Sequence, residues 1–228
     1  MKLSFNLINK NGGGSPVVED ITQCVIAGWA GRDRAAIEHH IEELAAIGVP
    51  RPSAVPLYYR VAANQLTQEP EIQVVGTGSS GEAEAFVFTH QGTLLVSIAS
   101  DHTDRTLEAH SVALSKQICV KPVAHDAWEF DSVKGHWDQL VLRSWIEERG
   151  DVVLYQEGSM DQLSRPEDLI QQGFSAPTLP PGTGMTCGTV TVRGSIRPAS
   201  EFTMELHDPV LKRSIRHRYT VTMLPEIA

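Results

Sequence analysis

The chain has 228 residues and a mass of 25.0 kDa, and 41% of its residues are hydrophobic, which is enough for one domain with a sizeable core. A net charge of −9 at pH 7 and a pI near 5.4 argue against nucleic acid and against anionic membrane surfaces as partners. An anionic small substrate is compatible with this balance, because a metal ion and a few basic side chains can reverse the charge of one pocket.

The first sixty residues are predicted to form two strands, a helix and a rigid connector. Residues 2–9 alternate apolar and polar side chains, as a strand does, and residues 21–28 form a second strand. Residues 33–47 are the clearest helix, because one face carries a stripe at helical spacing: Ala36, Ile37, His40, Ile41, Leu44 and Ile47. Gly48 ends this helix, and residues 50–56 are a proline-rich connector.

The rest of the chain is predicted to be rich in strands. Residues 82–88 and 93–99 form a hairpin, and Asp104 caps a helix at 106–118. Further segments are predicted as a hairpin (137–146 and 151–156), a short helix (166–172, with Gly173 after its end) and three late strands (185–192, 201–207 and 215–223). This mixture indicates an α+β, mainly β fold with mixed sheets.

The cysteines and the N-terminus indicate an intracellular protein. Cys24, Cys119 and Cys187 are odd in number and far apart, so a thiolate zinc site and a disulfide framework are both disfavoured. The first residues are too interrupted for a signal peptide, and no apolar run approaches the length of a membrane span. We therefore expect a soluble, cytoplasmic protein.

Two glutamates and an aspartate carry the strongest chemical signal. Glu82 and Glu84 are two residues apart, so in a strand they point to the same face. A two-residue turn at Gln91 and Gly92 would place Asp101 opposite Glu82 on that face. Adjacent carboxylates repel one another unless a cation compensates them. Three oxygen donors without a thiolate or an imidazole suit Mg²⁺ or Mn²⁺ better than Zn²⁺.

Basic side chains follow the aspartate. Arg105 can bind a substrate carboxylate with two parallel hydrogen bonds, and Lys116 can add a second positive charge. The alternative for this segment is a solvated loop with a helix cap, in which Arg105 and Lys116 have no functional role.

A histidine and a glutamate on the predicted helix form a candidate acid/base pair. His40 and Glu43 are three residues apart, so they can touch, and the glutamate can orient the imidazole. His39 and Glu42 have the same spacing and compete for this role. The alternative is a half-buried surface pair with no part in catalysis.

The order of these motifs resembles that of the fumarylacetoacetate hydrolase superfamily, most closely a bacterial branch of unknown function, the DUF2848-like proteins. The similar segments run from the helix with His40 and Glu43, through the proline-rich connector, to Glu82, Glu84 and the Asp101–Arg105 segment. Lys116 and the late pair Gly188 and Thr189 complete the series. Each motif is short, and their common order carries the resemblance.

The resemblance implies a mixed, barrel-like β-roll with an N-terminal subregion (residues 1–65) that carries a lid helix, and a catalytic domain (residues 66–228). It implies a homodimer whose small-molecule substrate is anionic. The roles that it implies are metal binding by Glu82, Glu84 and Asp101, catalysis by the acid/base pair His40 and Glu43 and by Lys116 near the substrate, and substrate binding by Arg105, Gln156 and Thr189. The chain departs from the family pattern at Thr183, at Val190 and in a shortened interval before Asp101.

The implied reaction is that of a metal-dependent hydrolase or lyase that acts on a 2-oxo acid through an enolate stabilised by Mg²⁺ or Mn²⁺. Hydrolysis of a C–C bond in a 2,4-dioxo acid such as an acylpyruvate is the first expectation. Hydration or dehydration, decarboxylation and isomerisation are alternatives on the same site. Two further alternatives are a small-molecule binding protein without turnover and an interaction module without metal, in which Glu82 and Glu84 would face solvent.

Overall fold

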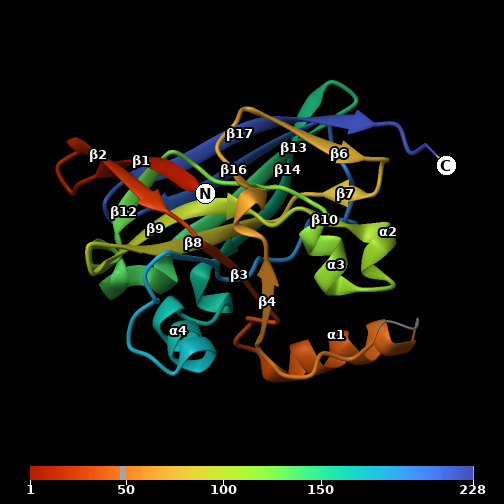
Figure 1. Cartoon of the computed structure of the whole chain (residues 1–228), viewed down its shortest axis with the longest axis horizontal. Coiled ribbons are helices and arrows are strands. Elements are labelled where there is room, and N and C mark those ends of the chain that lie inside the picture. The colour runs from red at the N-terminus through yellow and green to blue at the C-terminus, as the bar shows by residue number, and fades with distance from the viewer. Residues whose placement is uncertain (47–49, 228) are drawn as a thin grey trace.

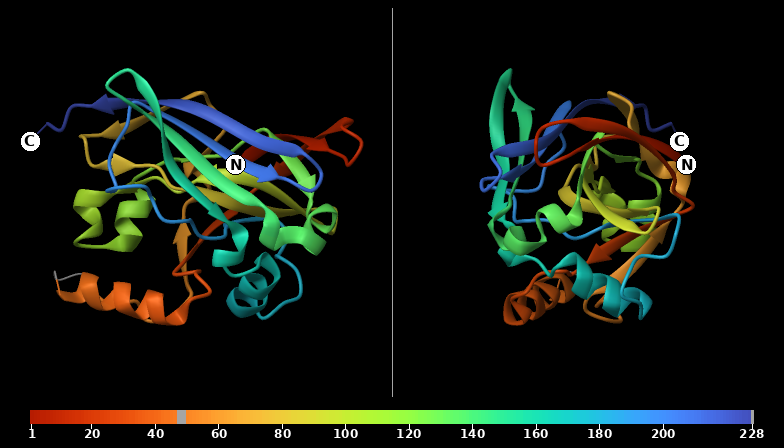
Figure 2. Two further views of the ribbon diagram at one scale, coloured as in Figure 1. Left: turned by 180° about the vertical axis from the view of Figure 1, so that it is seen from behind. Right: turned by 90° about the vertical axis from the view of Figure 1, so that its left-hand side faces the viewer.

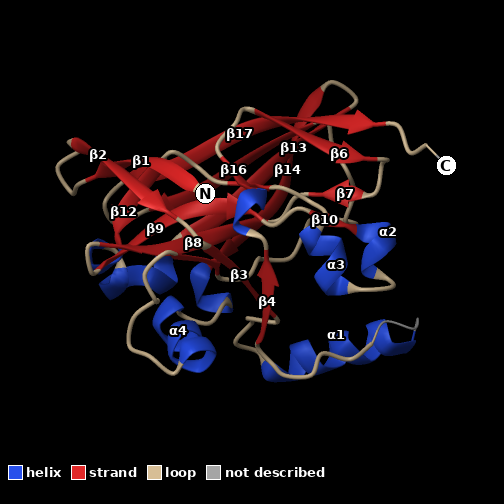
Figure 3. Cartoon of the chain, viewed as in Figure 1, coloured by secondary structure: helices blue, strands red, loops and turns tan. Residues whose placement is uncertain are grey.

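Two β-sheets form the body of the molecule, with the helices gathered along one side (Figures 1, 2 and 3). The computed structural model describes residues 1–46 and 50–227, without the side chains of His40, Glu43 and Leu44. None of the helices in this part of the chain is long and apolar enough to cross a membrane.

The larger sheet has eight strands in the order β2-β1-β12-β9-β8-β15-β3-β4, and it curls around its own inner face. Parallel pairs (β1 with β12, β15 with β3) are mixed with antiparallel pairs. Its strands are β1 (Lys2–Ile8), β2 (Gly14–Asp20), β3 (Gln23–Gly28), β4 (Leu57–Val61), β8 (Ala83–His90), β9 (Thr93–Ser100), β12 (Asp126–Glu129) and β15 (Thr183–Thr186).

The smaller sheet has five strands in the order β14-β13-β16-β17-β6. These are β6 (Glu71–Val75), β13 (Val141–Glu148), β14 (Asp151–Ser159), β16 (Glu201–Asp208) and β17 (Arg213–Leu224). Two short pairs lie at the end of the sheets, β7 (Ser79–Ser80) with β10 (Thr103–Asp104) and β5 (Leu66–Thr67) with β11 (Lys121–Pro122).

Four α-helices and four short 3₁₀ turns complete the described chain. The helices are α1 (Arg34–Ala46), α2 (Arg105–Glu108), α3 (Val112–Gln117) and α4 (Pro166–Phe174), and the turns are η1 (Ala63–Gln65), η2 (Phe130–Ser132), η3 (Lys134–Gln139) and η4 (Met160–Gln162). Asp33 accepts the first orphan N–H groups of α1 from Ala35 and Ala36, both at 3.0 Å.

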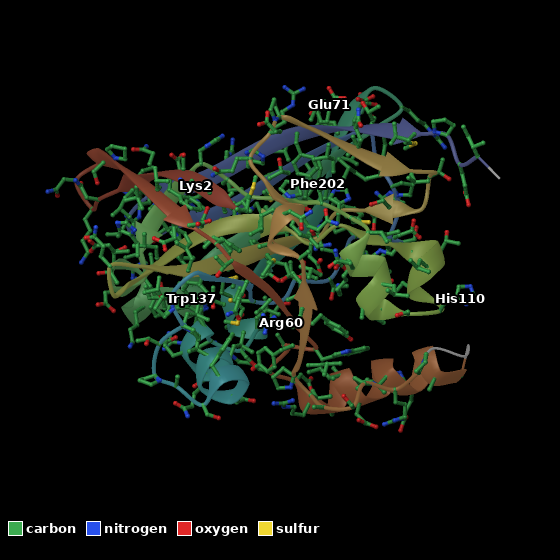
Figure 4. All side chains as sticks on the ribbon, in the orientation of Figure 1. Lys2, Arg60, Glu71, His110, Trp137 and Phe202 are labelled. Atoms are coloured by element: carbon green, nitrogen blue, oxygen red, sulfur yellow. The ribbon has the colours of Figure 1, made fainter. Side chains whose placement is uncertain are left out.

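Alternating side chains of β8 supply two hydrophobic cores. Ala85 and Val87 face the smaller sheet and join a core that includes Phe202 of β16 (Figure 4). Phe86 and Phe88 face the inside of the curl, where Phe88 stacks on Phe5 of β1 at 4.2 Å between ring centroids. Because Glu84 shares the face of Phe86 and Phe88, its carboxylate projects into the interior rather than into water.

The β8–β9 hairpin has the two-residue turn that the sequence predicts. Gln91 and Gly92 both have positive φ angles, +48° and +83°, as a tight hairpin of this twist requires. The register pairs Ala83 with Ser100, and one step further the Asp101 N–H donates to the Glu82 carbonyl at 2.9 Å. The prediction that Asp101 lies opposite Glu82 is therefore confirmed.

Several other element predictions need correction. The single helix expected at 106–118 is two helices, since Ser111 accepts a hydrogen bond from the Leu114 N–H and starts a new helix. Helix α4 continues through Gly173 and ends at Phe174, and its C-cap residue, Ser175, adopts the left-handed conformation. Strand β15 ends at Thr186 instead of continuing towards 192, and the chain turns at Gly188, where φ is +88°. Strand β2 has no counterpart in the sequence prediction.

Candidate metal centre

Three carboxylates converge at the end of the β8–β9 hairpin. One oxygen from each of Glu82, Glu84 and Asp101 lies within 4.8 Å of the others. Glu84 is 3% exposed and Asp101 is fully buried, while 15% of the Glu82 side-chain surface is exposed to solvent. The alternative of a module whose two glutamates face solvent is therefore wrong.

Asp101 is held between two lysines. The Lys116 ammonium donates to Oδ2 at 2.5 Å, and the Lys121 ammonium lies 3.1 Å from Oδ1. Burial alone would raise the pKa of Asp101, but the two ammonium groups outweigh it and lower that pKa below its ordinary value. Asp101 is therefore a permanent anion in the interior. Lys121 was not identified from the sequence.

Glu84 has a different environment. Its Oε2 accepts a hydrogen bond from the Gly188 N–H at 2.8 Å. A Cβ on Gly188 would lie 2.8 Å from the Cβ of Ala30, so a side chain there would clash. Burial, and then the negative charge of Asp101, raise the pKa of Glu84. The ionised form of Glu84 consequently needs a cation that its immediate protein partners do not fully provide.

Arg105 at the start of α2 faces the most exposed of the three carboxylates. Its Nη2 lies 3.0 Å from Glu82 Oε1, its Nη1 donates to Glu108 at 2.9 Å, and its Nε donates to Ser80 Oγ at 2.7 Å. These contacts occupy three of the five N–H groups of a guanidinium. Arg105 thus has donors left for an anion that approaches the triad.

Gln156 of β14 and Thr189 brace the strand between the two glutamates. Gln156 Oε1 accepts from the Ala83 N–H (3.0 Å) and from Ser144 Oγ (2.7 Å), and its Nε2 donates to Thr189 Oγ1 and to the Val190 carbonyl. Thr189 in turn donates to the Ala83 carbonyl at 2.7 Å. The hydrogen-bonding capacity of the Gln156 amide is therefore fully used within the protein.

A buried hydrogen-bonded chain behind the triad was also not identified from the sequence. Ser79 Oγ pairs with His102 Nδ1 at 3.0 Å, and His102 Nε2 pairs with the Tyr219 hydroxyl at 2.7 Å. Tyr219 donates to Ser100 Oγ at 2.8 Å, which accepts the Glu82 N–H at 3.2 Å. Burial, and then Lys121, lower the pKa of His102 to about 3, so this imidazole is neutral. This series of hydrogen bonds links β17 to the backbone that carries Glu82 and Asp101.

The donor set fits a hard divalent cation. All three ligands are carboxylates, which suit Mg²⁺ and Mn²⁺. Asp101 Oδ1 is buried and accepts no hydrogen bond of good geometry, although the Lys121 ammonium is near it. Since a carboxylate oxygen has two lone pairs, Oδ1 keeps acceptor capacity for a metal cation beside this ammonium.

The predicted acid/base pair lies on α1. The helix itself is confirmed, but the side chains of His40 and Glu43 lie outside the described residues. His39 and Glu42, the competing pair, are exposed. The roles of these residues stay predictions.

Comparisons with known proteins add a family and a fold. The model of a family described as "Protein of unknown function (DUF2848)" matches residues 27–219. No curated protein sequence matches the chain.

Three solved structures illustrate the similarity of fold. One is 2-keto-3-deoxy-D-arabinonate dehydratase complexed with magnesium and 2,5-dioxopentanoate, at 17% identity and a TM-score of 0.65 over 91% of this chain and 75% of that one. Another is Cg1458 with inhibitor, at 17% identity and 0.65 over 92% and 81%. The third is 4-oxalocrotonate decarboxylase from Pseudomonas putida G7 complexed with magnesium and adipate, at 14% identity and 0.53 over 90% and 78%. The expected α+β fold of the fumarylacetoacetate hydrolase type is thereby confirmed.

Proposed function

We propose that this chain, which belongs to the DUF2848 family of proteins of unknown function, is a divalent-metal-dependent enzyme that acts on a 2-oxo acid. The observation that carries this proposal is the triad of Glu82, Glu84 and Asp101, of which Glu84 and Asp101 are buried, and in which one oxygen from each residue lies within 4.8 Å of the others. The similar structures support it, because two of them are named as enzymes in complex with magnesium and small organic acids.

In this proposal, Glu82, Glu84 and Asp101 hold Mg²⁺ or Mn²⁺. The bound ion supplies Lewis acidity to the keto and carboxylate oxygens of a 2-oxo acid. Arg105 uses its remaining N–H groups to orient the substrate carboxylate. Lys116, whose ammonium is 2.5 Å from Asp101, places a positive charge where negative charge develops on the substrate.

The other predicted residues have supporting or proton-transfer roles. Gln156 and Thr189 fix the Ala83 backbone between the two glutamates, and Thr189 lines the site. His40 and Glu43 move the proton when α1 closes over the substrate. We further propose a cytoplasmic homodimer in which residues 1–65 form the lid-bearing subregion and residues 66–228 the catalytic domain.

The reaction proposed first is hydrolysis of a C–C bond in a 2,4-dioxo acid such as an acylpyruvate. A second candidate is a lyase reaction, dehydration or decarboxylation, on the same site. The names of the similar structures favour this second candidate, since they include a dehydratase and a decarboxylase. Incubating the Mg²⁺-loaded protein with acylpyruvates and with 2-keto-3-deoxy sugar acids, and following products by NMR, separates the two.

Calorimetric titration of EDTA-treated protein with Mg²⁺ and Mn²⁺, with and without oxalate, tests the metal site. We expect one ion per chain, bound more tightly when oxalate is present. Glu82→Gln should weaken metal binding by about tenfold or more, because it removes one charged ligand. Absence of metal binding by the native chain would refute the proposed function. Metal binding without turnover of any 2-oxo acid would favour a binding protein.

A further inference from the structure

Lys121 is a buried charge to which the proposed function gives no role. Lys121 lies on β11, which pairs with β5, and none of its surface is exposed. Its ammonium lies 3.1 Å from Asp101 Oδ1, and it also donates to the carbonyl of His102 and, at 2.7 Å, to the carbonyl of Lys116. Three oxygens therefore surround its three N–H groups, so the ammonium is fixed in place.

One counter-ion would be enough for Asp101. Lys116 already provides it at 2.5 Å and is only 7% exposed. A second ammonium without contact to water carries a further desolvation cost of several kcal/mol. The second ammonium therefore places more positive charge beside Asp101 than that single carboxylate requires.

The net charge of the cluster determines how this additional positive charge affects ligand binding. Three carboxylates (Glu82, Glu84 and Asp101) face three cations (Arg105, Lys116 and Lys121). Glu108 pairs with Arg105 from outside, where 30% of its side chain is exposed and water screens it. When all six groups are ionised this set is balanced, and a divalent cation in the triad would add two positive charges to it. The loaded site would then attract an anion, and would attract a dianion more strongly than a monoanion.

We propose that Lys121 is a fixed positive charge that weakens metal binding by the triad and strengthens binding of the substrate anion. This inference rests on the proposed function and extends it to the substrate class. The preferred ligands of the loaded site are 2-oxo acids that carry two negative charges when bound. Lys121 acts through the field at the site and through Asp101, so it is a positioning and specificity residue without contact to the substrate.

An electrostatic role of Lys121 and a purely structural role predict different directions of change in the metal and anion affinities. The same ammonium repels a metal cation and attracts an anion, so its removal changes the two affinities in opposite directions. Its effect on an anion scales with the charge of that anion. Loss of a merely structural lysine would loosen Asp101 and weaken both kinds of binding.

The test is Lys121→Gln in the full chain, since glutamine keeps a donor for the two carbonyls and loses the charge. Calorimetry with Mn²⁺ on EDTA-treated protein should show metal affinity increased about tenfold. Titration of the Mn²⁺-loaded protein should show oxalate affinity decreased about tenfold and pyruvate affinity decreased about threefold. The matched control is Lys134→Gln, which removes a 53% exposed lysine paired with Glu167 and should change each affinity by less than about twofold.

Each other outcome overturns the inference. Weaker binding of both metal and oxalate would assign Lys121 a structural role, and unchanged affinities would show that its charge is not felt at the site. If Lys121→Gln does not fold by circular dichroism, Lys121→Met is measured in its place, and failure of both to fold also makes the residue structural. A native protein that binds no Mn²⁺ refutes the proposed function, whereas native binding with an unaffected variant refutes only this inference.

Discussion

The charged cluster at the end of the β8–β9 hairpin and the helix α1 are held by very different forces. In the cluster, Asp101, Lys116 and Arg105 each have charged partners within 3.1 Å and little contact with water. In α1, Ile41 is the only described side chain that is buried, and the ion pair of Arg51 with Glu38 is about half exposed. The groups that need fixed geometry thus lie at the end of the hairpin and on the two small helices after it, and the proposed proton-transfer residues lie on a helix with one buried side chain among those described. This difference is expected between a rigid site and its lid.

The largest effect should come from Asp101→Asn, which breaks the cluster. The substitution leaves the ammonium groups of Lys116 and Lys121 buried without their shared carboxylate. We expect a loss of about 3–5 kcal/mol in the free energy of unfolding, measured by urea denaturation of the metal-free protein. The exposed pair of Asp138 with Arg32 offers the control, and Asp138→Asn should cost less than about 1 kcal/mol. Equal effects of the two variants would contradict the comparison.

Ile41→Ala should weaken the packing of the second region, helix α1. Ile41 is 3% exposed and is the main apolar anchor among the described side chains of α1. Its truncation should weaken the docking of α1 by about 2 kcal/mol, which corresponds to about thirtyfold faster hydrogen exchange of α1 amides. Amides of β8 and β9 should exchange as in the native protein. If exchange of the hairpin accelerates equally, the two regions unfold together and α1 is no separate lid.

Glu84→Gln should raise the stability of the metal-free protein at high pH while it weakens metal binding. Because burial and Asp101 raise the pKa of Glu84, folded protein holds this proton more tightly than unfolded protein does. The native metal-free protein should therefore lose stability as the pH rises from 4.5, the ordinary value, to about 8.

The glutamine variant should not show this loss. At pH 8 and without metal it should exceed the native protein by at least about 1 kcal/mol in urea denaturation, while its Mn²⁺ affinity falls about tenfold or more. A variant that is less stable than the native protein at pH 8 would mean that Glu84 is already neutralised by its protein partners.

The smallest effect should come from Glu38→Gln on α1. This carboxylate pairs with Arg51 while about half of each side chain is exposed, so water screens the attraction. The free energy of unfolding should change by less than about 0.5 kcal/mol. A loss above about 1 kcal/mol would show that this surface pair anchors the segment, and the contrast with the cluster would be weaker than we infer.

The part of the site that the sequence predicts follows from local rules. The spacing of Glu82 and Glu84 and the two-residue turn at Gln91 and Gly92 are enough to bring the three carboxylates together, since strand alternation and hairpin register are short-range properties. The break between α2 and α3 was not predicted, although Ser111, a residue type favoured at helix N-caps, is a local signal for it.

The remaining features depend on contacts between distant segments. Lys121 reaches Asp101 because β11 pairs with β5. The spacing of residues along the chain does not predict that pairing. Tyr219 meets His102 only when β17 packs against the hairpin. Gly188 belongs to the series of motifs in the sequence, but its partner, the Glu84 carboxylate, becomes evident only in the fold.

All six charged groups of the cluster come from one continuous run of chain, Glu82 to Lys121. Closing loops this short costs little chain entropy, so the hairpin and the two small helices after it can bring five of these charges together early in folding, and Lys121 joins them when β11 pairs with β5. Strands β16 and β17 are made last, and β17 supplies Tyr219, which hydrogen-bonds to His102 and Ser100 behind the triad. During synthesis, the acidic and basic groups can therefore pair in water first, and the sheet that excludes water closes over partners that have already met.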